Sequence, residues 1–163
     1  MSGNQPSGSD LPPILHNGII KGRYSLLLQG FLNDATDKKP YYTPVAALGT
    51  VTYDGEVNAD GSGGVSGSVV LKFVSNDATV DGWVEKKVAI VEGSKYWIDA
   101  DEIFGRAFFL VQFPDGSQHQ LHFFFVIEDA GKTIKTLSTI TAPFNSVQWG
   151  NQTRLDPVDR FLD

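Results

Sequence analysis

The side chains most able to do chemistry lie within apolar stretches of the sequence. His122 stands between Leu121 and Phe123, and on a strand it would share a face with Gln120 and Phe124. If that face is enclosed, His122 is a buried titratable group that could act as an acid, a base or a hydrogen-bond donor. The alternative is a histidine satisfied by a neighbour on the outside of the fold or at a subunit contact.

Arg106 is the second polar side chain in an apolar run. On a strand it would share a face with Phe108, Leu110 and Gln112. An enclosed arginine must meet a carboxylate or a polarised ligand oxygen, because an unpaired buried charge costs several kcal/mol. The alternative places Arg106 near a strand end, with its guanidinium group reaching water.

Five of the chain's tyrosines and tryptophans are further candidates, each with a polar group on a large apolar body: Tyr24, Tyr53, Tyr96, Trp83 and Trp97. Such residues suit both a packed core and a ligand pocket, where the hydroxyl or indole group could orient a substrate carbonyl. Packing is the default interpretation.

The sequence does not favour a metal, a cofactor or a covalent nucleophile. His16, His119 and His122 are the only histidines and cysteine is absent. His119 and His122 would point to opposite faces of a strand, whereas a catalytic metal usually needs three protein ligands. The glycine-rich residues 58–64 lack the sequel of a phosphate-binding loop, and no serine has the context of a nucleophile elbow. We therefore expect no metal site and no cofactor.

Residues 103–141 dominate the predicted architecture. Two apolar runs, residues 104–113 and 121–127, meet at a Pro-Asp-Gly-Ser turn, and a second turn at 128–132 leads into a third strand at 133–141. Both faces of these strands are largely apolar, which indicates that the outer face is also covered.

The preceding chain reads as five further strands, at residues 22–31, 45–53, 65–73, 83–91 and 95–99. Small residues Ala47 and Gly49 share a face in the second of these, which marks a sharp bend or the close approach of a neighbour. About eight antiparallel strands joined by short turns close most economically into an up-and-down β-barrel, because closure removes unpaired edges. An eight-stranded barrel has room for side chains or one small ligand.

One domain is the natural prediction for 163 residues. We expect a disordered N-terminal arm at residues 1–18, the barrel at 19–142 and an extension at 143–163, in which Asp156 and Pro157 open a short helix. No apolar run is long enough to span a bilayer and no secretion signal is evident, so a cytoplasmic protein is expected. A net charge of −6 without a basic block argues against nucleic acid as a partner.

Turn and packing motifs recur over most of residues 22–141: Gly22-Arg23-Tyr24, Gly30-Phe31, Pro44-Val45-Ala46-Ala47-Leu48-Gly49-Thr50, Asp54-Gly55, the glycine-rich residues 63–67 and Tyr96-Trp97-Ile98-Asp99. Their order resembles that of small microbial barrels of the calycin and allene oxide cyclase type. The resemblance implies a barrel with a small hydrophobic cavity. Proteins of this type include cofactor-free cyclases and isomerases, among them spirotetronate-type cyclases and allene oxide cyclases, as well as pure binding proteins. No catalytic residue of these families matches a position here.

The first functional expectation is a cofactor-independent cyclase or isomerase acting on a hydrophobic, polyene or polyketide-like metabolite. The barrel would fold the substrate into its reactive shape while polar groups stabilise developing charge. The candidate catalytic residues are His122, Arg106 and Tyr53, and the candidate substrate-binding residues are Tyr24, Gln120, Phe124, Phe108, Gln112, Tyr96 and Trp97. A lipocalin-like carrier of an apolar small molecule would need the same cavity. A third possibility is a structural module whose interior is filled by its own phenylalanines.

Association with further copies is a separate expectation. Phe109, Val111 and Phe113 oppose Phe108 and Leu110 across one strand, and Phe123 and Phe125 oppose His122 and Phe124 across the next. One set must lie outside the barrel. We expect a homodimer or homotrimer through that surface, or residues 143–163 wrapped over it.

Overall fold

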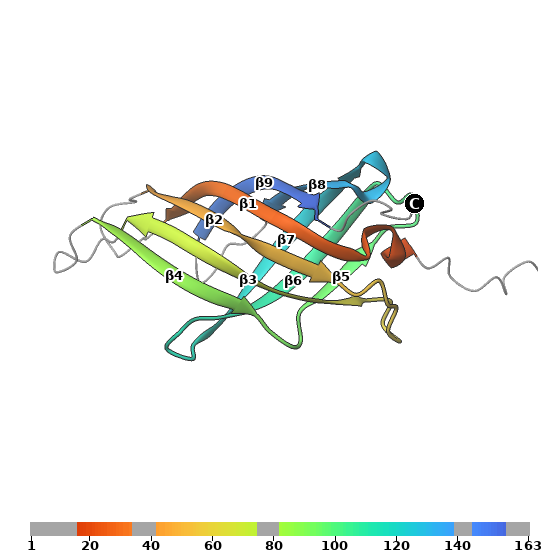
Figure 1. Ribbon diagram of the computed structural model, residues 1–163, viewed down its shortest axis with the longest axis horizontal. Coiled ribbons are helices and arrows are strands. Elements are labelled where there is room, and N and C mark those ends of the chain that lie inside the picture. The colour runs from red at the N-terminus through yellow and green to blue at the C-terminus, as the bar shows by residue number, and fades with distance from the viewer. Residues whose placement is uncertain (1–15, 34–41, 75–81, 139–144, 156–163) are drawn as a thin grey trace, which may run out of the picture.

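The computed structural model describes residues 16–33, 42–74, 82–138 and 145–155 (Figure 1). Nine strands and two short 3₁₀ turns account for most of them. In chain order they are η1 (His16–Ile20), β1 (Gly22–Asn33), β2 (Tyr42–Tyr53), β3 (Gly63–Val74), β4 (Trp83–Ile90), β5 (Lys95–Ile98), β6 (Phe104–Gln112), β7 (Gln118–Glu128), η2 (Asp129–Gly131), β8 (Thr133–Ser138) and β9 (Asn145–Arg154). None of the helical segments described is long and apolar enough to cross a membrane.

The strands form a closed antiparallel barrel. Neighbours in sequence pair with one another around the wall, and β9 pairs with β1 from Tyr24↔Arg154 to Asn33↔Asn145, which completes the closure. β4 and β5 share one position, since each pairs with β3 on one side and with β6 on the other. The result is an eight-stranded barrel with one extra strand, so the all-β, up-and-down barrel prediction is confirmed.

A bulge separates β4 from β5. The chain from Ile90 to Lys95 is longer than the stretches of β3 and β6 that it faces, so the extra residues loop out of the wall. Gly93 takes a left-handed conformation there (φ +97°). The Ser94 hydroxyl donates to the Val91 carbonyl at 2.8 Å and accepts from the Leu110 amide at 2.8 Å. The Ser94 side chain thus satisfies backbone groups of Val91 and Leu110 where the bulge interrupts regular strand pairing.

On β6 and β7 the inner face of the barrel is the face with fewer polar residues. In β6 the buried positions include Ala107, Phe109 and Val111, while β7 buries Phe123 and Phe125. The opposing residues of the same two strands, Phe108, Leu110, His122 and Phe124, lie outside. The prediction that one of the two sets must lie outside the barrel is therefore confirmed.

Aromatic rings fill the interior near η1. Tyr24 and Tyr53 meet edge to face with ring centroids 5.6 Å apart, and Tyr53 makes similar contacts with Tyr96 at 4.9 Å and Phe125 at 6.1 Å. All four side chains are 0–1% exposed. This part of the barrel is a packed core, and edge-to-face geometry adds about 0.5–1.5 kcal/mol per pair beyond area burial.

η1 closes this end of the barrel. Asn17 donates to the carbonyls of Glu56 and Gly61 at 3.0 Å each, and its side-chain oxygen accepts from the Ile98 amide at 3.1 Å. Ile20 is completely buried. Residues 16–18, which were expected to belong to a disordered arm, thus lie in the segment that forms this cap. The rest of that expected arm lies outside the described residues.

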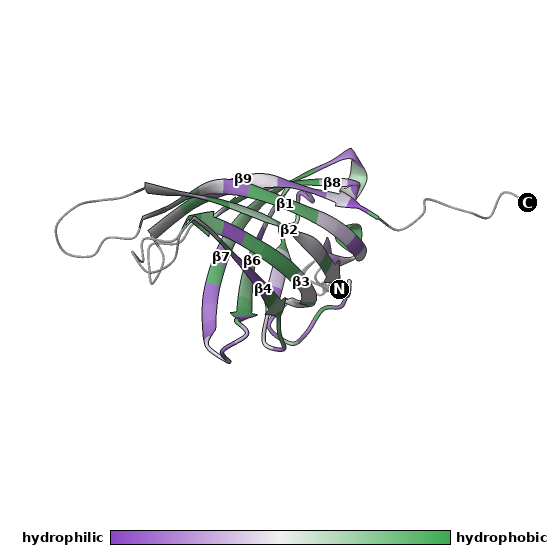
Figure 2. Ribbon diagram, turned by 60° about the vertical axis from the view of Figure 1, so that its left-hand side comes forward, coloured by the Kyte–Doolittle hydropathy of each residue, from purple (hydrophilic) through white to green (hydrophobic). Residues whose placement is uncertain are grey.

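The opposite end of the barrel is more open. β4 pairs with β6 only at Ala89↔Gln112 and Ile90↔Val111, so its first residues pair with β3 alone among the strands described. The hairpin of β6 and β7 extends beyond the short pairing between β4 and β6 and ends in hydrophilic residues (Figure 2). Inward-facing side chains near this end, such as Phe73 and Val84, are only half-buried.

The C-terminal region differs from its prediction. Residues 145–154 were expected in an extension outside the barrel, but they form β9, which closes the wall between β8 and β1. The helix expected from Asp156 onward lies outside the described residues, and no described residue supports it.

Candidate functional site

The structure separates the ten candidate site residues into two groups. Tyr24, Tyr53 and Tyr96 face the barrel interior and are buried. The other seven lie on the outside of β5, β6 and β7, where none of them is buried: His122, Arg106, Gln120, Phe124, Phe108, Gln112 and Trp97. Of the two interpretations left open for His122 and Arg106, the enclosed one is therefore wrong, and both side chains take the outward position that was its alternative. On β5, β6 and β7 the opposite face carries no charged residue. Burying that face costs less free energy than burying the face that carries Arg106 and His122.

Tyr24 is part of the scaffold rather than an open ligand contact. Its hydroxyl donates to the Gly131 carbonyl and accepts a 2.9 Å hydrogen bond from Nη2 of Arg154. The same Nη2 atom donates to the Ile19 carbonyl at 2.9 Å, and the guanidinium lies over the Tyr24 ring. The contacts tie together β1, β9 and the segments at both 3₁₀ turns.

The other two interior tyrosines are also committed to protein partners. Tyr53 donates to Oε1 of Gln152 at 2.7 Å, and Nε2 of Gln152 donates to the Thr136 hydroxyl at 3.0 Å. Tyr96 accepts from the Gly55 amide at 2.9 Å and donates to the Asn17 carbonyl at 3.3 Å. Burial raises the pKa of both phenols well above the ordinary value, because a low-dielectric interior disfavours the phenolate. Both remain protonated and hydrogen-bonded at neutral pH.

The outward candidates lie next to one another across the strands. Arg106 is the cross-strand partner of Phe124, and Phe108 is the partner of His122, whose ring it meets edge to face at 5.1 Å. Gln112 accepts from the Gln118 side chain at 3.1 Å. His122 and Gln120 are exposed, so neither has the enclosed environment that acid–base chemistry was expected to use.

A groove on the outside of β6, β7 and β8 has a better-defined shape. It encloses about 470 Å³, which is within the range of small-molecule sites. Two rows of side chains cross it: Arg106, Phe124 and Leu137 form one, and Phe104, Val126 and Lys135 form the other. The remaining lining comes from Asp99, Gly105, Phe125 and Thr136. Four of the lining side chains are apolar and 36–59% exposed, which is unusual for large hydrophobic residues on a surface.

Two cations border this groove. The Arg106 guanidinium lies over the Trp97 ring, 5.3 Å from its centroid, and no described carboxylate forms an ion pair with it. Lys135 forms a 2.9 Å ion pair with Glu128, but both side chains are exposed, so the pair is worth little. Arg106 thus remains available to an anion beside an apolar surface.

Sequence reasoning found Arg106 and Phe124 but missed the other groove residues. Phe104, Val126, Lys135 and Leu137 come from three strands, and only the pairing register brings them together. The usable signal was alternation: in residues 133–138, Lys135 and Leu137 share the face opposite the buried Ile134 and Thr136.

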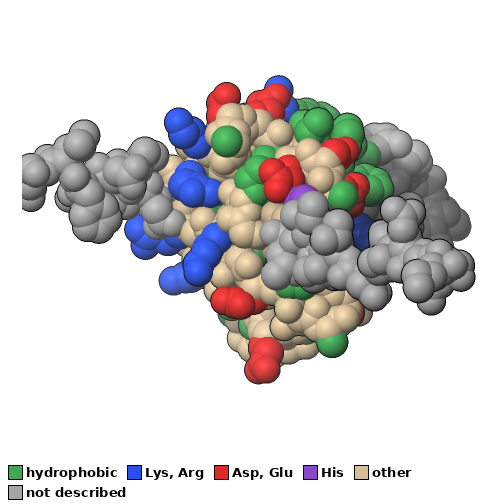
Figure 3. Space-filling view, turned by 90° about the vertical axis from the view of Figure 1, so that its right-hand side faces the viewer, with side chains coloured by type: hydrophobic (Ala, Val, Ile, Leu, Met, Phe, Trp, Pro, Cys, Tyr) green, Lys and Arg blue, Asp and Glu red, His purple; other side chains and the backbone are tan. Residues whose placement is uncertain are grey.

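The glycine-rich residues 58–64 form a turn, as predicted. The Asn58 amide donates to the Ser62 carbonyl at 2.8 Å, and Oδ2 of Asp60 pairs with Lys95 at 2.8 Å. Hydrogen bonds from Lys95 and Ser62 hold the pKa of Asp60 well below its usual range. Within the described ranges, no group of three or more His, Asp or Glu side chains is placed to hold a metal ion. Acidic and basic side chains are both present over the end of the barrel that carries η1 and this turn (Figure 3).

Comparison with protein-family models, curated proteins and solved structures gave no match to this chain. The resemblance to calycin and allene oxide cyclase-type barrels therefore stays a prediction, and functional inference depends on the geometry of the groove.

Proposed function

We propose that the protein binds an apolar organic molecule with an anionic group, without converting it, in the groove over β6, β7 and β8. The observation that carries this proposal is the position of Arg106, a cation without an ion-pair partner among the described residues, beside the exposed Phe124. The proposal keeps the hydrophobic-ligand carrier expected from the sequence but moves its site from the interior to the outer wall.

The groove supports moderate affinity. A chain of about fifteen carbons lying along Phe104, Phe124 and Leu137 would remove roughly 200 Å² of apolar surface from water, worth about 5 kcal/mol. A carboxylate near Arg106 would add about 1 kcal/mol in this exposed setting. Before the cost of immobilising the ligand is subtracted, these contributions set the tightest dissociation constant at about 0.05 mM.

Binding is favoured over catalysis for a physical reason. A cyclase that works by shape needs a site from which water is excluded, and its charged groups act most strongly there. Arg106 and Lys135 are exposed, and the interior hydroxyls of Tyr24, Tyr53 and Tyr96 already have protein partners. A cyclase or isomerase acting on a polyene thus has less support from these residues than a carrier.

The test uses farnesoate, a C15 polyene carboxylate, and farnesol, its uncharged counterpart, in calorimetric titrations of the full chain. Farnesoate should bind about fivefold more tightly than farnesol. Arg106→Gln should remove that preference, whereas Phe124→Ala should weaken both ligands. Gln120→Ala, an outward change on β7 outside the groove lining, is the matched control and should alter neither affinity.

Chromatography of the recovered ligand separates the carrier from the enzyme. Unchanged farnesoate after prolonged incubation agrees with the proposal, while a new product of the same mass would favour the isomerase. Equal affinities for farnesoate and farnesol in the unaltered protein would rule out the role given to Arg106.

A further inference from the structure

A second exposed apolar surface lies on the other side of β8. It consists of five outward side chains from β9, β1 and β2, which we call the apolar wall: Val147, Trp149, Leu27, Phe31 and Leu48. Their exposed fractions run from 41% to 62%. They adjoin one another, since Leu27 pairs with Leu48, Phe31 pairs with Val147, and the rings of Phe31 and Trp149 are 6.2 Å apart.

Charge is nearly absent from this part of the barrel. Among the outward positions of β9, β1 and β2 whose side chains are described, Arg23 is the only charged one. The chain as a whole carries a net charge of −6, and many of its acids lie in turns, such as Asp54, Asp101 and Asp115. Depletion of charge at the centre of a patch distinguishes interfaces from ordinary surface. Two copies meeting through this wall would not oppose carboxylates at its centre.

The apolar wall also has a protruding side chain and a hollow that could fit together between two copies. One cross-strand row runs Lys135, Asn151, Leu27, Leu48 and Val70 from β8 to β3. Leu48, the most exposed large apolar side chain described, stands one strand from Leu27. On the other side of Leu27 lies a hollow of about 260 Å³ lined in part by Asn151 and Trp149, with Lys135 of β8 as the one charged residue in its lining. A two-fold axis through Leu27 would place Leu48 of each copy over the hollow of the other.

The area is adequate for a stable contact. A large side chain presents on the order of 150–250 Å², so five half-exposed ones leave roughly 450 Å² of apolar surface. With the uncharged polar residues between them, the wall approaches the ~800 Å² per partner that standard interfaces bury.

We propose that two copies of this chain associate through the apolar wall in an isologous dimer. Their sheets would pack face to face, about 10 Å apart and with strands inclined by roughly 30°, as in aligned sheet packing. The dimer places Leu27 at its centre. Because Lys135 lines both the groove and the hollow, and Leu137 of the groove pairs with Trp149 of the wall, the dimer is tested without added ligand.

Sedimentation velocity at several protein concentrations tests the dimer. The unaltered protein should sediment at twice 17.8 kDa. Leu48→Glu should weaken association at least a hundredfold, because it would bury an unpaired charge at the contact. Trp83→Glu is the matched control: Trp83 is 57% exposed on β4, away from the wall, and its replacement should leave the dimer intact. Should Leu48→Glu fail to fold by circular dichroism, Leu48→Gln takes its place.

Cross-linking locates the contact. The chain has no cysteine, so Leu27→Cys and Trp83→Cys each provide one thiol for a short bismaleimide. Covalent dimers from Leu27→Cys but not from Trp83→Cys support the proposal. A monomeric unaltered protein would overturn it. A dimer that survives both Leu48→Glu and Leu48→Gln would also overturn it.

Discussion

The Tyr53 hydroxyl donates a 2.7 Å hydrogen bond to Oε1 of Gln152, which joins β2 to β9 across the barrel interior. Both side chains are almost completely buried. Tyr53→Phe should lower the free energy of unfolding by about 1–3 kcal/mol, because it leaves a buried amide oxygen without this donor. Urea denaturation measures the loss. In a double-mutant cycle with Gln152→Leu, a coupling energy near zero would show that the bond contributes nothing.

Alkaline pH provides a second test of the packed interior. Burial raises the pKa values of Tyr53 and Tyr96 above the value near 10 that they have in an unfolded chain. Above about pH 10 the unfolded state therefore loses protons that the folded state keeps, so the free energy of unfolding falls as pH rises. Below that pH these tyrosines do not make the free energy of unfolding depend on pH.

Urea denaturation between pH 8 and pH 11 checks this expectation. Each raised tyrosine contributes a slope of up to about 1.4 kcal/mol per pH unit above pH 10. Tyr53→Phe should make the decline shallower, and Tyr53→Phe with Tyr96→Phe shallower still. An identical decline in the unaltered protein and the double variant would contradict the buried, protonated state of these side chains.

The approach of β2 to β3 leaves no space at Gly49. A Cβ atom built there would lie 2.2 Å from the Ser68 carbonyl oxygen, a backbone atom that cannot swing away. Gly49→Ala should destabilise the barrel by about 1–3 kcal/mol, as overpacking does. Gly18→Ala is the control, because nothing lies within 4 Å of the Cβ position there. Equal thermal unfolding midpoints for the two variants would refute the close approach, which the sequence had predicted from Ala47 and Gly49.

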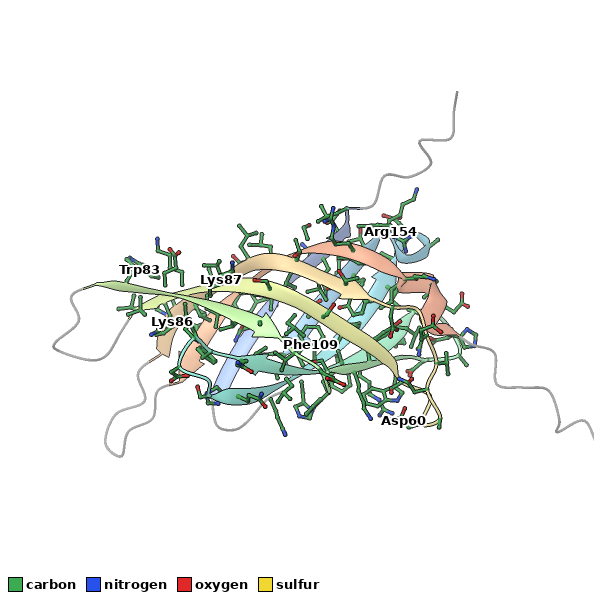
Figure 4. All side chains as sticks on the ribbon, turned by 60° about the horizontal axis from the view of Figure 1, so that its bottom comes forward. Asp60, Trp83, Lys86, Lys87, Phe109 and Arg154 are labelled. Atoms are coloured by element: carbon green, nitrogen blue, oxygen red, sulfur yellow. The ribbon has the colours of Figure 1, made fainter. Side chains whose placement is uncertain are left out.

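Two lysines lie in the part of β4 that, among the described strands, pairs only with β3. Lys86 faces inward, as its partner Leu71 does, yet it is exposed because the wall does not close around it. Trp83, Lys86 and Lys87 lie at the end of the barrel opposite Asp60 (Figure 4). Inward-pointing charges on an edge strand discourage pairing with other chains. Lys86→Val with Lys87→Val should therefore aggregate faster on concentration, as light scattering would show, whereas Lys72→Val on the paired β3 should not.

Much of the fold could be predicted from local patterns. Turn residues at 114–117 and apolar alternation place β6 and β7. The turn itself is held by hydrogen bonds from the Phe113 amide to the Ser117 carbonyl and from the Gly116 amide to the Phe113 carbonyl. β9 escaped prediction because its inward positions include Gln148 and Gln152, which no apolar pattern would mark. The Gln152 side chain is buried because Tyr53 and Thr136, which come from other strands, satisfy both ends of its amide, and the backbone amide of Gln148 donates to the Ser138 hydroxyl.

The candidate site was harder to predict because both faces of β6 and β7 carry large apolar residues. Alternation alone leaves the choice of inner face open, and the polar content of each face decides it: Arg106 and His122 mark the outside. The groove adds residues from β8 whose proximity depends on strand register rather than on sequence distance. No local signal indicates that Lys135 lies one strand away from Val126.

The most direct test of a ligand site on the outer wall is a set of ¹⁵N–¹H spectra of the full chain recorded while farnesoate is added. The account predicts that the amide shifts of Gly105, Arg106, Phe124 and Lys135 change with one common affinity, while those of inward-facing residues at the open end stay constant. Shifts concentrated instead at Leu71, Phe73, Val84 and Leu121 would place the ligand inside the barrel and contradict the account.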